Sequence, residues 1–89
     1  MRHFLLFYEY VSDILDRRGP HRDAHLALVR RWKDEGSIVL AGALGDPPHG
    51  AAFVFRVEDP ARIDEFTRED PYIAAGLVTE RRVESWTVV

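Results

Sequence analysis

The sequence predicts an α+β fold of the ferredoxin-like type, in which a four-stranded antiparallel sheet carries its helices on one face. Three observations support this prediction: an apolar alternating first strand, a long amphipathic helix after a Gly-Pro pair, and a hairpin followed by an Asp-Pro helix start. Together they give the order β-α-β-β-α-β, which is the split arrangement of two βαβ-like halves around a central hairpin. We expect a single domain over residues 1–89.

The first strand is predicted over residues 2–10, where apolar and aromatic side chains fill both alternating faces. One face carries Phe4, Leu6, Tyr8 and Tyr10, and the other carries His3, Leu5, Phe7 and Glu9. Because both faces are mostly apolar, we expect a central strand that is covered on both sides.

The long helix is predicted over residues 21–35. Pro20 suits its first turn, and Gly36 suits a left-handed residue after its end. The apolar stripe follows the i, i+3, i+4, i+7 rule and consists of His25, Leu28, Val29 and Trp32. A histidine therefore occupies a position that should face the sheet.

The remaining elements follow from turn residues. Strands are predicted over 37–44, 51–57 and 79–88, with a loop over 45–50, a helix capped by Asp59 that ends near residue 69, and a short helical piece that ends at Gly76. Gly42 inside a strand predicts a bulge or a close backbone approach.

The second face of the sheet also carries apolar residues, among them Val83 or Trp86 in the last strand. A bare apolar face of four strands would be too large to leave in water. We therefore expect a homodimer in which two sheets meet or partly close into a barrel.

Composition narrows the class of protein. The chain is 46% hydrophobic, which suffices for a folded core, and its net charge of −3 without a basic stripe argues against nucleic acid as a partner. It has no cysteine, which excludes thiol catalysis and disulfides and fits a reducing compartment. No segment reads as a membrane span or signal peptide, so we expect a cytoplasmic protein.

His25 is the principal candidate for chemistry, because histidine titrates near neutral pH and can carry a proton. The alternative is a core histidine that bonds to a neighbouring carbonyl or hydroxyl. A general base needs an orienting carboxylate, and the best one is Asp70, although an Asp before a proline is more often a helix cap. His21 lies four residues before His25, a zinc-ligand spacing, and His49 or Asp70 could complete such a site, but no glutamate follows His21 as in metalloproteases.

A cluster of arginines precedes and begins the long helix: Arg17, Arg18 and Arg22. It is either a solvated surface, with Asp16 and Asp23 nearby, or a rim that binds a substrate carboxylate or phenolate. Aromatic side chains form either core or the walls of a pocket, and Tyr8 and Tyr72 are the candidates for contact with a substrate.

Several short motifs together resemble the YciI-like (YCII-related) family over essentially the whole chain. They are Arg18-x-x-x-Arg22-x-x-His25-Leu26, then Leu40-Ala41-Gly42, then Asp70-Pro71-Tyr72-x-x-Ala75-Gly76-Leu77, and finally Trp86. The resemblance implies a dimeric α+β barrel with a His–Asp dyad, which here is His25 and Asp70. It also implies a cofactor-free activity, since one branch of the family is a dehydrochlorinase of a chlorinated hydroxyhydroquinone. Ala43 departs from the Gly-Pro that family members often carry after the second-strand alanine, so the pocket near this strand should differ.

Taken together, the sequence predicts a small acid–base enzyme without cofactor or metal, of the elimination or isomerisation type. His25 would move the proton, Asp70 would orient the imidazole, and Arg18 and Arg22 would bind the anionic part of a small substrate, for example an aromatic one. A non-catalytic ligand-binding or accessory module of the same fold is the alternative, and a purely structural role for His25 is a third reading.

Overall fold

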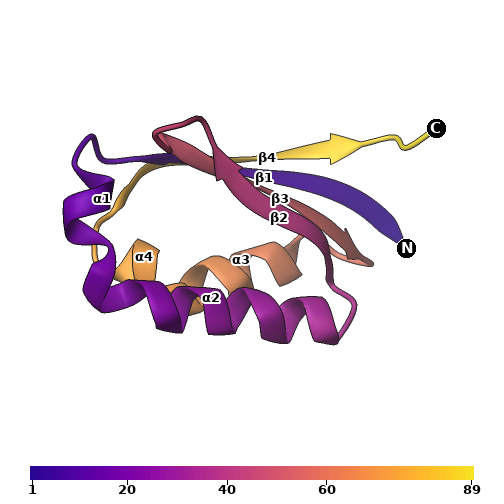
Figure 1. Ribbon diagram of the computed structural model, residues 1–89. Coiled ribbons are helices and arrows are strands. Elements are labelled where there is room, and N and C mark those ends of the chain that lie inside the picture. The colour runs from indigo at the N-terminus through magenta and orange to yellow at the C-terminus, as the bar shows by residue number, and fades with distance from the viewer.

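The computed structural model describes all 89 residues, and its four strands form one sheet in the order β2-β3-β1-β4, with every neighbouring pair antiparallel. The strands are β1 (Arg2–Tyr10), β2 (Ile38–Leu44), β3 (Gly50–Val57) and β4 (Val78–Trp86). The helices are α1 (Ile14–Arg17), α2 (Gly19–Asp34), α3 (Ala61–Glu69) and α4 (Pro71–Ala74). Figure 1 shows α2, α3 and α4 on one face of the sheet, which confirms the ferredoxin-like α+β fold.

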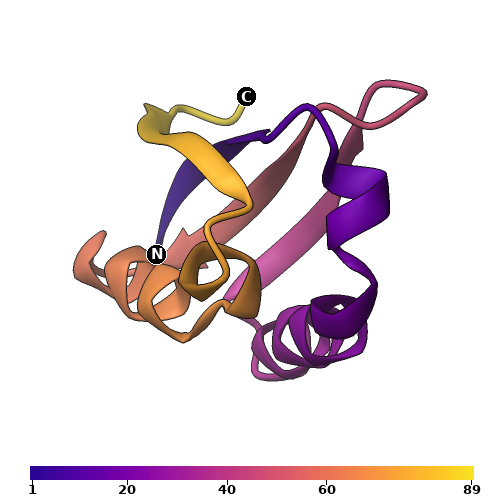
Figure 2. The ribbon, with the colours of Figure 1, turned by 90° about the vertical axis from the view of Figure 1, so that its left-hand side faces the viewer.

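β1 lies in the middle of the sheet, between β3 and β4, as its apolar pattern predicts. Phe4, Leu6 and Tyr8 are buried on the side of the helices. On the open side, Leu5 and Phe7 are only half-buried. Within one chain, the prediction that both faces of this strand are covered therefore holds for the helix side only. Figure 2 shows this asymmetry, with α2 and α3 side by side against one face.

The stripe predicted for the long helix is confirmed, because the buried residues of α2 are His25, Leu28, Val29 and Trp32. The helix begins at Gly19, two residues before the predicted start, since proline is accepted in a first turn and does not delay it. Gly36 has φ +88°, the left-handed conformation expected after the helix end.

The hairpin differs from the prediction in one detail. The irregularity in β2 lies between Ile38 and Leu40, and Gly42 pairs regularly with Ala52, so the bulge predicted at Gly42 is wrong. β2 is an edge strand and a Cβ at Gly42 would meet nothing within 4 Å, so no close approach requires glycine there. The close approach is at Gly50 instead, where a Cβ would collide with the backbone oxygen of Tyr8.

Each of the two Asp-Pro pairs stands at the start of a helix: Asp59-Pro60 precedes α3, and Asp70-Pro71 joins α3 to α4. Asp59 accepts a hydrogen bond from the backbone N–H of Ala61 at 2.9 Å, and Asp70 does the same for Tyr72 at 3.0 Å. α4 ends shortly before Gly76, as predicted.

No helix of the structure is both long and apolar enough to cross a membrane.

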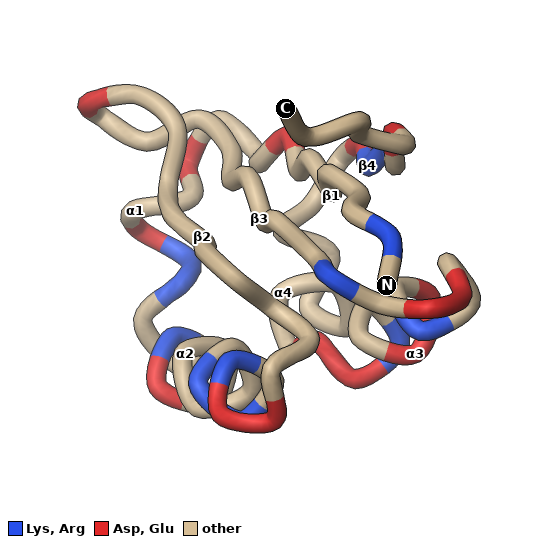
Figure 3. The backbone as a smooth tube through the Cα atoms, turned by 90° about the vertical axis from the view of Figure 1, so that its right-hand side faces the viewer, with Lys and Arg blue, Asp and Glu red and all other residues tan.

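The face of the sheet opposite the helices is open. Its central row contains Leu40, Val54 and Leu5, which are paired across three strands, and Leu40 is 65% exposed. Trp86 lies opposite His3 on this face, whereas Val83 lies opposite Leu6 and therefore on the helix side. Figure 3 shows that β2 carries no charged residue, whereas α2 and α3 carry many.

Candidate functional site

Asp70 lies at the junction of α3 and α4, and its carboxylate is fully buried. Pro71 after it disfavours a helical backbone at Asp70, which has φ −73° and ψ 118°. This extended residue ends one helix and caps the next, so the chain turns and directs the side chain inward. The cap bond to the Tyr72 N–H fixes Oδ1.

Two further donors complete the environment of this carboxylate. The His25 Nδ1 lies 2.8 Å from Oδ1, and the Tyr8 hydroxyl donates to Oδ2 at 2.7 Å. All three partners are donors, which matches an ionised carboxylate, since that group can only accept. No buried side-chain nitrogen or oxygen lacks a partner. Asp70 is thus both a helix cap and the partner of a histidine, two roles that one carboxylate can fill.

His25 projects from the buried face of α2 and is only 6% exposed. Its ring stacks on Tyr72 with centroids 3.9 Å apart and planes 3° apart. Because Asp70 accepts at Nδ1, the neutral ring carries its proton there and leaves a lone pair on Nε2. Nε2 has no hydrogen-bond partner in the protein. Every buried side-chain nitrogen or oxygen has such a partner, so Nε2 must be accessible to solvent.

A cavity of about 150 Å³ lies beside His25, between α2 and the small residues of β2. Its lining is mostly apolar and comprises Tyr10, Arg18, Arg22, His25, Leu26, Val29, Ala41, Gly42, Ala43, Ala51, Phe53 and Tyr72. Arg18 and Arg22 form no ion pair, whereas Arg17 pairs with Asp13 at 3.5 Å. Two guanidinium groups are therefore free to bind an anion in this cavity.

Burial and the neighbouring charges change the acidity of three tyrosines. Desolvation, followed by the negative charge of Asp70, raises the pKa of Tyr8 far above its usual value of 10. Desolvation also raises the pKa of Tyr10 and of Tyr72, and at Tyr72 the charges of Arg18 and Arg22 partly oppose this effect. All three phenols stay protonated at neutral pH and can act as hydrogen-bond donors.

The structure brings together all six site residues that the sequence suggested. His25, Arg18, Arg22 and Tyr72 line the cavity, and Asp70 lies directly behind the imidazole. Tyr8 does not line the cavity, and its hydroxyl is bound to Asp70. The tyrosine of β1 that lines it is Tyr10, which the alternation of β1 places on the same face.

The other histidines do not join this site. His21 and His49 do not line the cavity, and His49 lies 3.7 Å from Glu9 at the exposed end of the hairpin. No group of three or more histidine, aspartate or glutamate side chains is placed to hold a metal ion. Phe53 and Ala51 of the cavity wall were not anticipated, although the alternation of β3 puts both on the buried face.

Comparison with known proteins gives the family. A sequence model of the YCII-related domain matches residues 1–87. The chain belongs to this family. It is also 28% identical to Protein YciI of Escherichia coli over 83 residues, which covers 83% of this chain and 85% of that protein. The family predicted from the short motifs is therefore confirmed.

Solved structures extend the comparison. The 5-chloro-2-hydroxyhydroquinone dehydrochlorinase of Burkholderia phenoliruptrix, solved with 2,5-dihydroxybenzoquinone, is 25% identical and superposes with a TM-score of 0.81 over 96% of this chain and 93% of that one. An antibiotic biosynthesis monooxygenase is 19% identical, with a TM-score of 0.63 over 100% of this chain and 99% of its own, and shares the fold.

Proposed function

We propose that this member of the YCII-related family is a small acid–base enzyme that uses His25 and Asp70 in an elimination or isomerisation. The observation that carries the proposal is the buried His–Asp pair, whose imidazole lines a cavity with two unpaired arginines and has no protein partner at Nε2. The similarity to a dehydrochlorinase supports an elimination, because the loss of HCl is a reaction of this type.

The proposed reaction needs one proton carrier. Nε2 of His25 takes a proton from a C–H or O–H bond of the substrate, and Asp70 stabilises the imidazolium that forms. In an elimination, the leaving group departs with its bonding electrons and a double bond forms in the substrate. In an isomerisation, the proton returns to a different atom of the substrate. Side chains of this chain supply every group in these steps, so the proposal includes no cofactor.

The cavity supports a small planar anion as the substrate. A dry cavity of about 150 Å³ can hold a benzene ring, and this one has that volume. Tyr10 and Phe53 supply aromatic walls, and Arg18 and Arg22 would bind a phenolate or carboxylate oxygen. The ring of Tyr72 stacks on His25 and would lie next to the bound substrate.

The test uses two probes, 5-chloro-2-hydroxyhydroquinone for turnover and 2,5-dihydroxybenzoquinone for binding. Chloride release and thermal shift are measured for the wild type, for His25→Gln, and for His49→Gln as a matched control outside the cavity. Loss of the proton carrier should lower kcat by about 10²–10⁴-fold, while His49→Gln should match the wild type. Unchanged turnover in His25→Gln would contradict the proposal. Binding without turnover in all three proteins would support a non-catalytic ligand-binding module instead.

We also propose that the open face of the sheet is the contact between two copies of this chain. The exposed apolar residues Leu40 and Trp86 lie on this face together with half-buried Leu5 and Phe7. The β2 part of this face carries no charge, so contact between two copies over β2 would remove no ion from water there. The charged residues of the face, among them Arg82 and Glu84, lie towards the opposite edge of the sheet, in β4.

Sedimentation of two variants tests the dimer. Leu40→Asp puts a charge in the middle of the open face and should give a monomer. Leu15→Asp is the matched control, because Leu15 is 51% exposed but lies on α1, away from this face. A wild-type monomer at micromolar concentration, or a Leu40→Asp variant that still dimerises, would contradict the proposal.

A cytoplasmic location stays a prediction from the cysteine-free composition.

A further inference from the structure

We propose that Tyr8 is a positioning residue of the dyad, whose hydroxyl holds Asp70 in one orientation and thereby sets how tightly His25 keeps a proton. Tyr8 does not line the cavity, so it acts through Asp70 and not by contact with a substrate. The inference deepens the proposed function, on which it rests, but its main measurement needs no substrate.

The two oxygens of Asp70 are held by different parts of the chain. Oδ1 accepts from His25 and from the backbone N–H of Tyr72, whereas Oδ2 accepts only from Tyr8. Without the Tyr8 hydroxyl, the carboxylate plane would be fixed at one oxygen, and the other would be a buried acceptor without a partner.

The Tyr8 hydroxyl is itself held rigidly. Tyr8 is 1% exposed in the middle of β1, where it pairs with Ala51 of β3 and Arg81 of β4. Its ring packs against Phe53 with centroids 4.9 Å apart. A hydroxyl anchored by the central strand can fix a carboxylate that is 62 residues away in the sequence.

The direction of the effect follows from the dipole of the hydroxyl. Its positive end points at Asp70, and it opposes the addition of a further proton to the His25–Asp70 pair. The other polar groups that face this pair and Tyr8 stay in place when only the hydroxyl is removed: Tyr10 of β1, Arg18 and Arg22 at the start of α2, Tyr72 of α4 and Arg81 of β4. Tyr8→Phe should therefore make the pair bind its proton more tightly.

NMR titration of the histidine ring protons tests this directly. In Tyr8→Phe, the midpoint of the His25 titration should move upward by about one pH unit, the size expected from the loss of one hydrogen bond to a charged group. His3, His21 and His49 serve as internal references and should not move. Tyr10→Phe is the matched control, because the Tyr10 hydroxyl makes no bond to Asp70, and its His25 midpoint should match the wild type. A folded Tyr8→Phe with an unchanged midpoint overturns the proposal, even if its stability falls.

A second measurement uses the wild type alone, in case Tyr8→Phe does not fold. With ¹³C-labelled tyrosine, the ring signals of Tyr8 should inflect at the pH at which His25 titrates, because the two groups share one carboxylate. No inflection at Tyr8 overturns the proposal.

Kinetics separates this proposal from the proposed function. If the chlorinated probe is turned over, the acid limb of kcat/KM in Tyr8→Phe should move upward with the His25 midpoint, and binding of the quinone probe should not change. The higher midpoint leaves less unprotonated base, so turnover near neutral pH should fall up to about tenfold per pH unit. If no probe is turned over, the proposed function fails while the NMR result still decides the role of Tyr8.

Discussion

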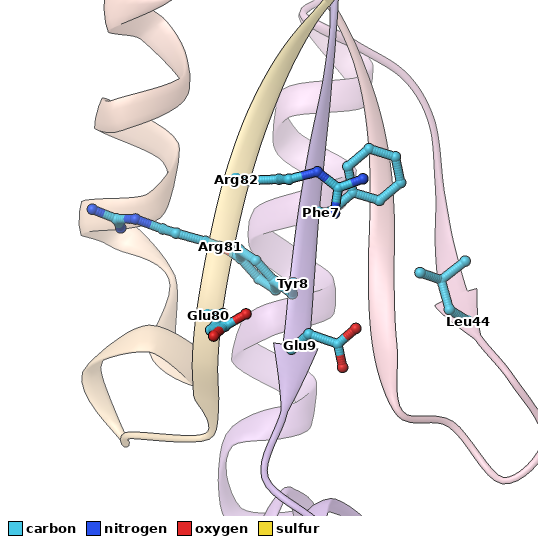
Figure 4. Close-up of a pocket in the computed structure, with 7 residues that line it drawn as sticks. All are labelled: Phe7, Tyr8, Glu9, Leu44, Glu80, Arg81 and Arg82. Carbon is cyan, nitrogen blue, oxygen red and sulfur yellow. The ribbon is translucent and has the colours of Figure 1, made fainter.

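The two faces of the sheet use the same kinds of residue in different ways. On the helix side, Asp70 and His25 are buried, and each polar atom sealed from solvent has a partner. On the open side, a hollow of about 270 Å³ has a lining that includes Phe7, Glu9, Leu44, Glu80 and Arg82. Figure 4 shows Arg82 beside the ring of Phe7 on this side. The guanidinium carbon of Arg82 lies 4.2 Å from the centroid of that ring.

The comparison shows that burial, more than residue type, decides which charged groups depend on specific protein partners. The carboxylates of Glu9 and Glu80 are exposed, so water and salt screen them. Asp70 is removed from water and depends on three protein donors, so each donor has a large effect on it. Four predictions test this difference, from the largest expected effect to the smallest.

The largest effect is expected at Asp70. Asp70→Ala leaves the buried donors of Tyr8, His25 and Tyr72 without an acceptor, which should cost about 3–5 kcal/mol of unfolding free energy. Asp34→Ala at the C-terminal end of α2 is the control, and it should change stability by about 0.5 kcal/mol or less, because Asp34 is exposed. Chemical denaturation at pH 7 measures both, and equal losses would contradict the comparison.

The second prediction compares the loss of unfolding free energy at two adjacent leucines of β1, whose side chains point to opposite faces of the sheet. Leu6 is fully buried, so Leu6→Ala should cost about 2–5 kcal/mol. Leu5 is half-buried on the open face, and Leu5→Ala should cost less, because it returns less apolar area to water. Denaturation curves at several protein concentrations give both values. A cost for Leu5→Ala that grows with protein concentration would add evidence for the dimer.

The third effect is the response of stability to alkaline pH. Burial and Asp70 raise the pKa of Tyr8 in the folded state, so the unfolded chain releases this proton first, near pH 10. The stabilisation is fully present below pH 10 and is lost as the pH rises above it, by about 1.4 kcal/mol per pH unit from Tyr8. Tyr8→Phe should lower this slope by that amount in denaturation between pH 9 and 11 (roughly the range that brackets the phenol). An unchanged slope would show that the raised pKa of Tyr8 does not cause the loss of stability at alkaline pH.

The smallest effect on stability is expected for an ion pair that is exposed to solvent. Arg31 of α2 and Glu69 of α3 form an ion pair in which the side chains are 63% and 49% exposed. A double-mutant cycle with Arg31→Gln and Glu69→Gln should give a coupling of only about 0.2–1 kcal/mol. A coupling as large as the loss at Asp70 would show that exposure does not weaken charge pairs here.

Local pattern predicted much of this molecule. The periodicity of α2 identified all four of its buried residues, and the alternation of β1 identified its two faces. Both follow from geometry within one element, which depends on sequence spacing alone. Element boundaries differed by one or two residues, and the bulge in β2 was misplaced because pairing with β3, not the glycine, determines where the strand is irregular.

The hydrogen bond between Tyr8 and Asp70 could not be predicted from local sequence pattern. Its position in an apolar face is equally consistent with core packing and with contact to a substrate. The turn between α3 and α4 places the carboxylate of Asp70 next to the Tyr8 hydroxyl, and local pattern does not predict this contact. Tyr10, two residues later on the same face, lines the cavity instead.

By itself, the sequence determined the class of fold, the residue types of the site and the family, because hydrophobic spacing, turn residues and short motifs are written along the chain. The tertiary structure alone decided that Asp70 meets His25 across 45 residues and Tyr8 across 62, and that Arg18 and Arg22 stay unpaired beside them. The physical reason is that a buried carboxylate takes its partners from whatever elements pack around it. Those partners come from three separate elements, β1, α2 and α4, which only the folded chain brings together.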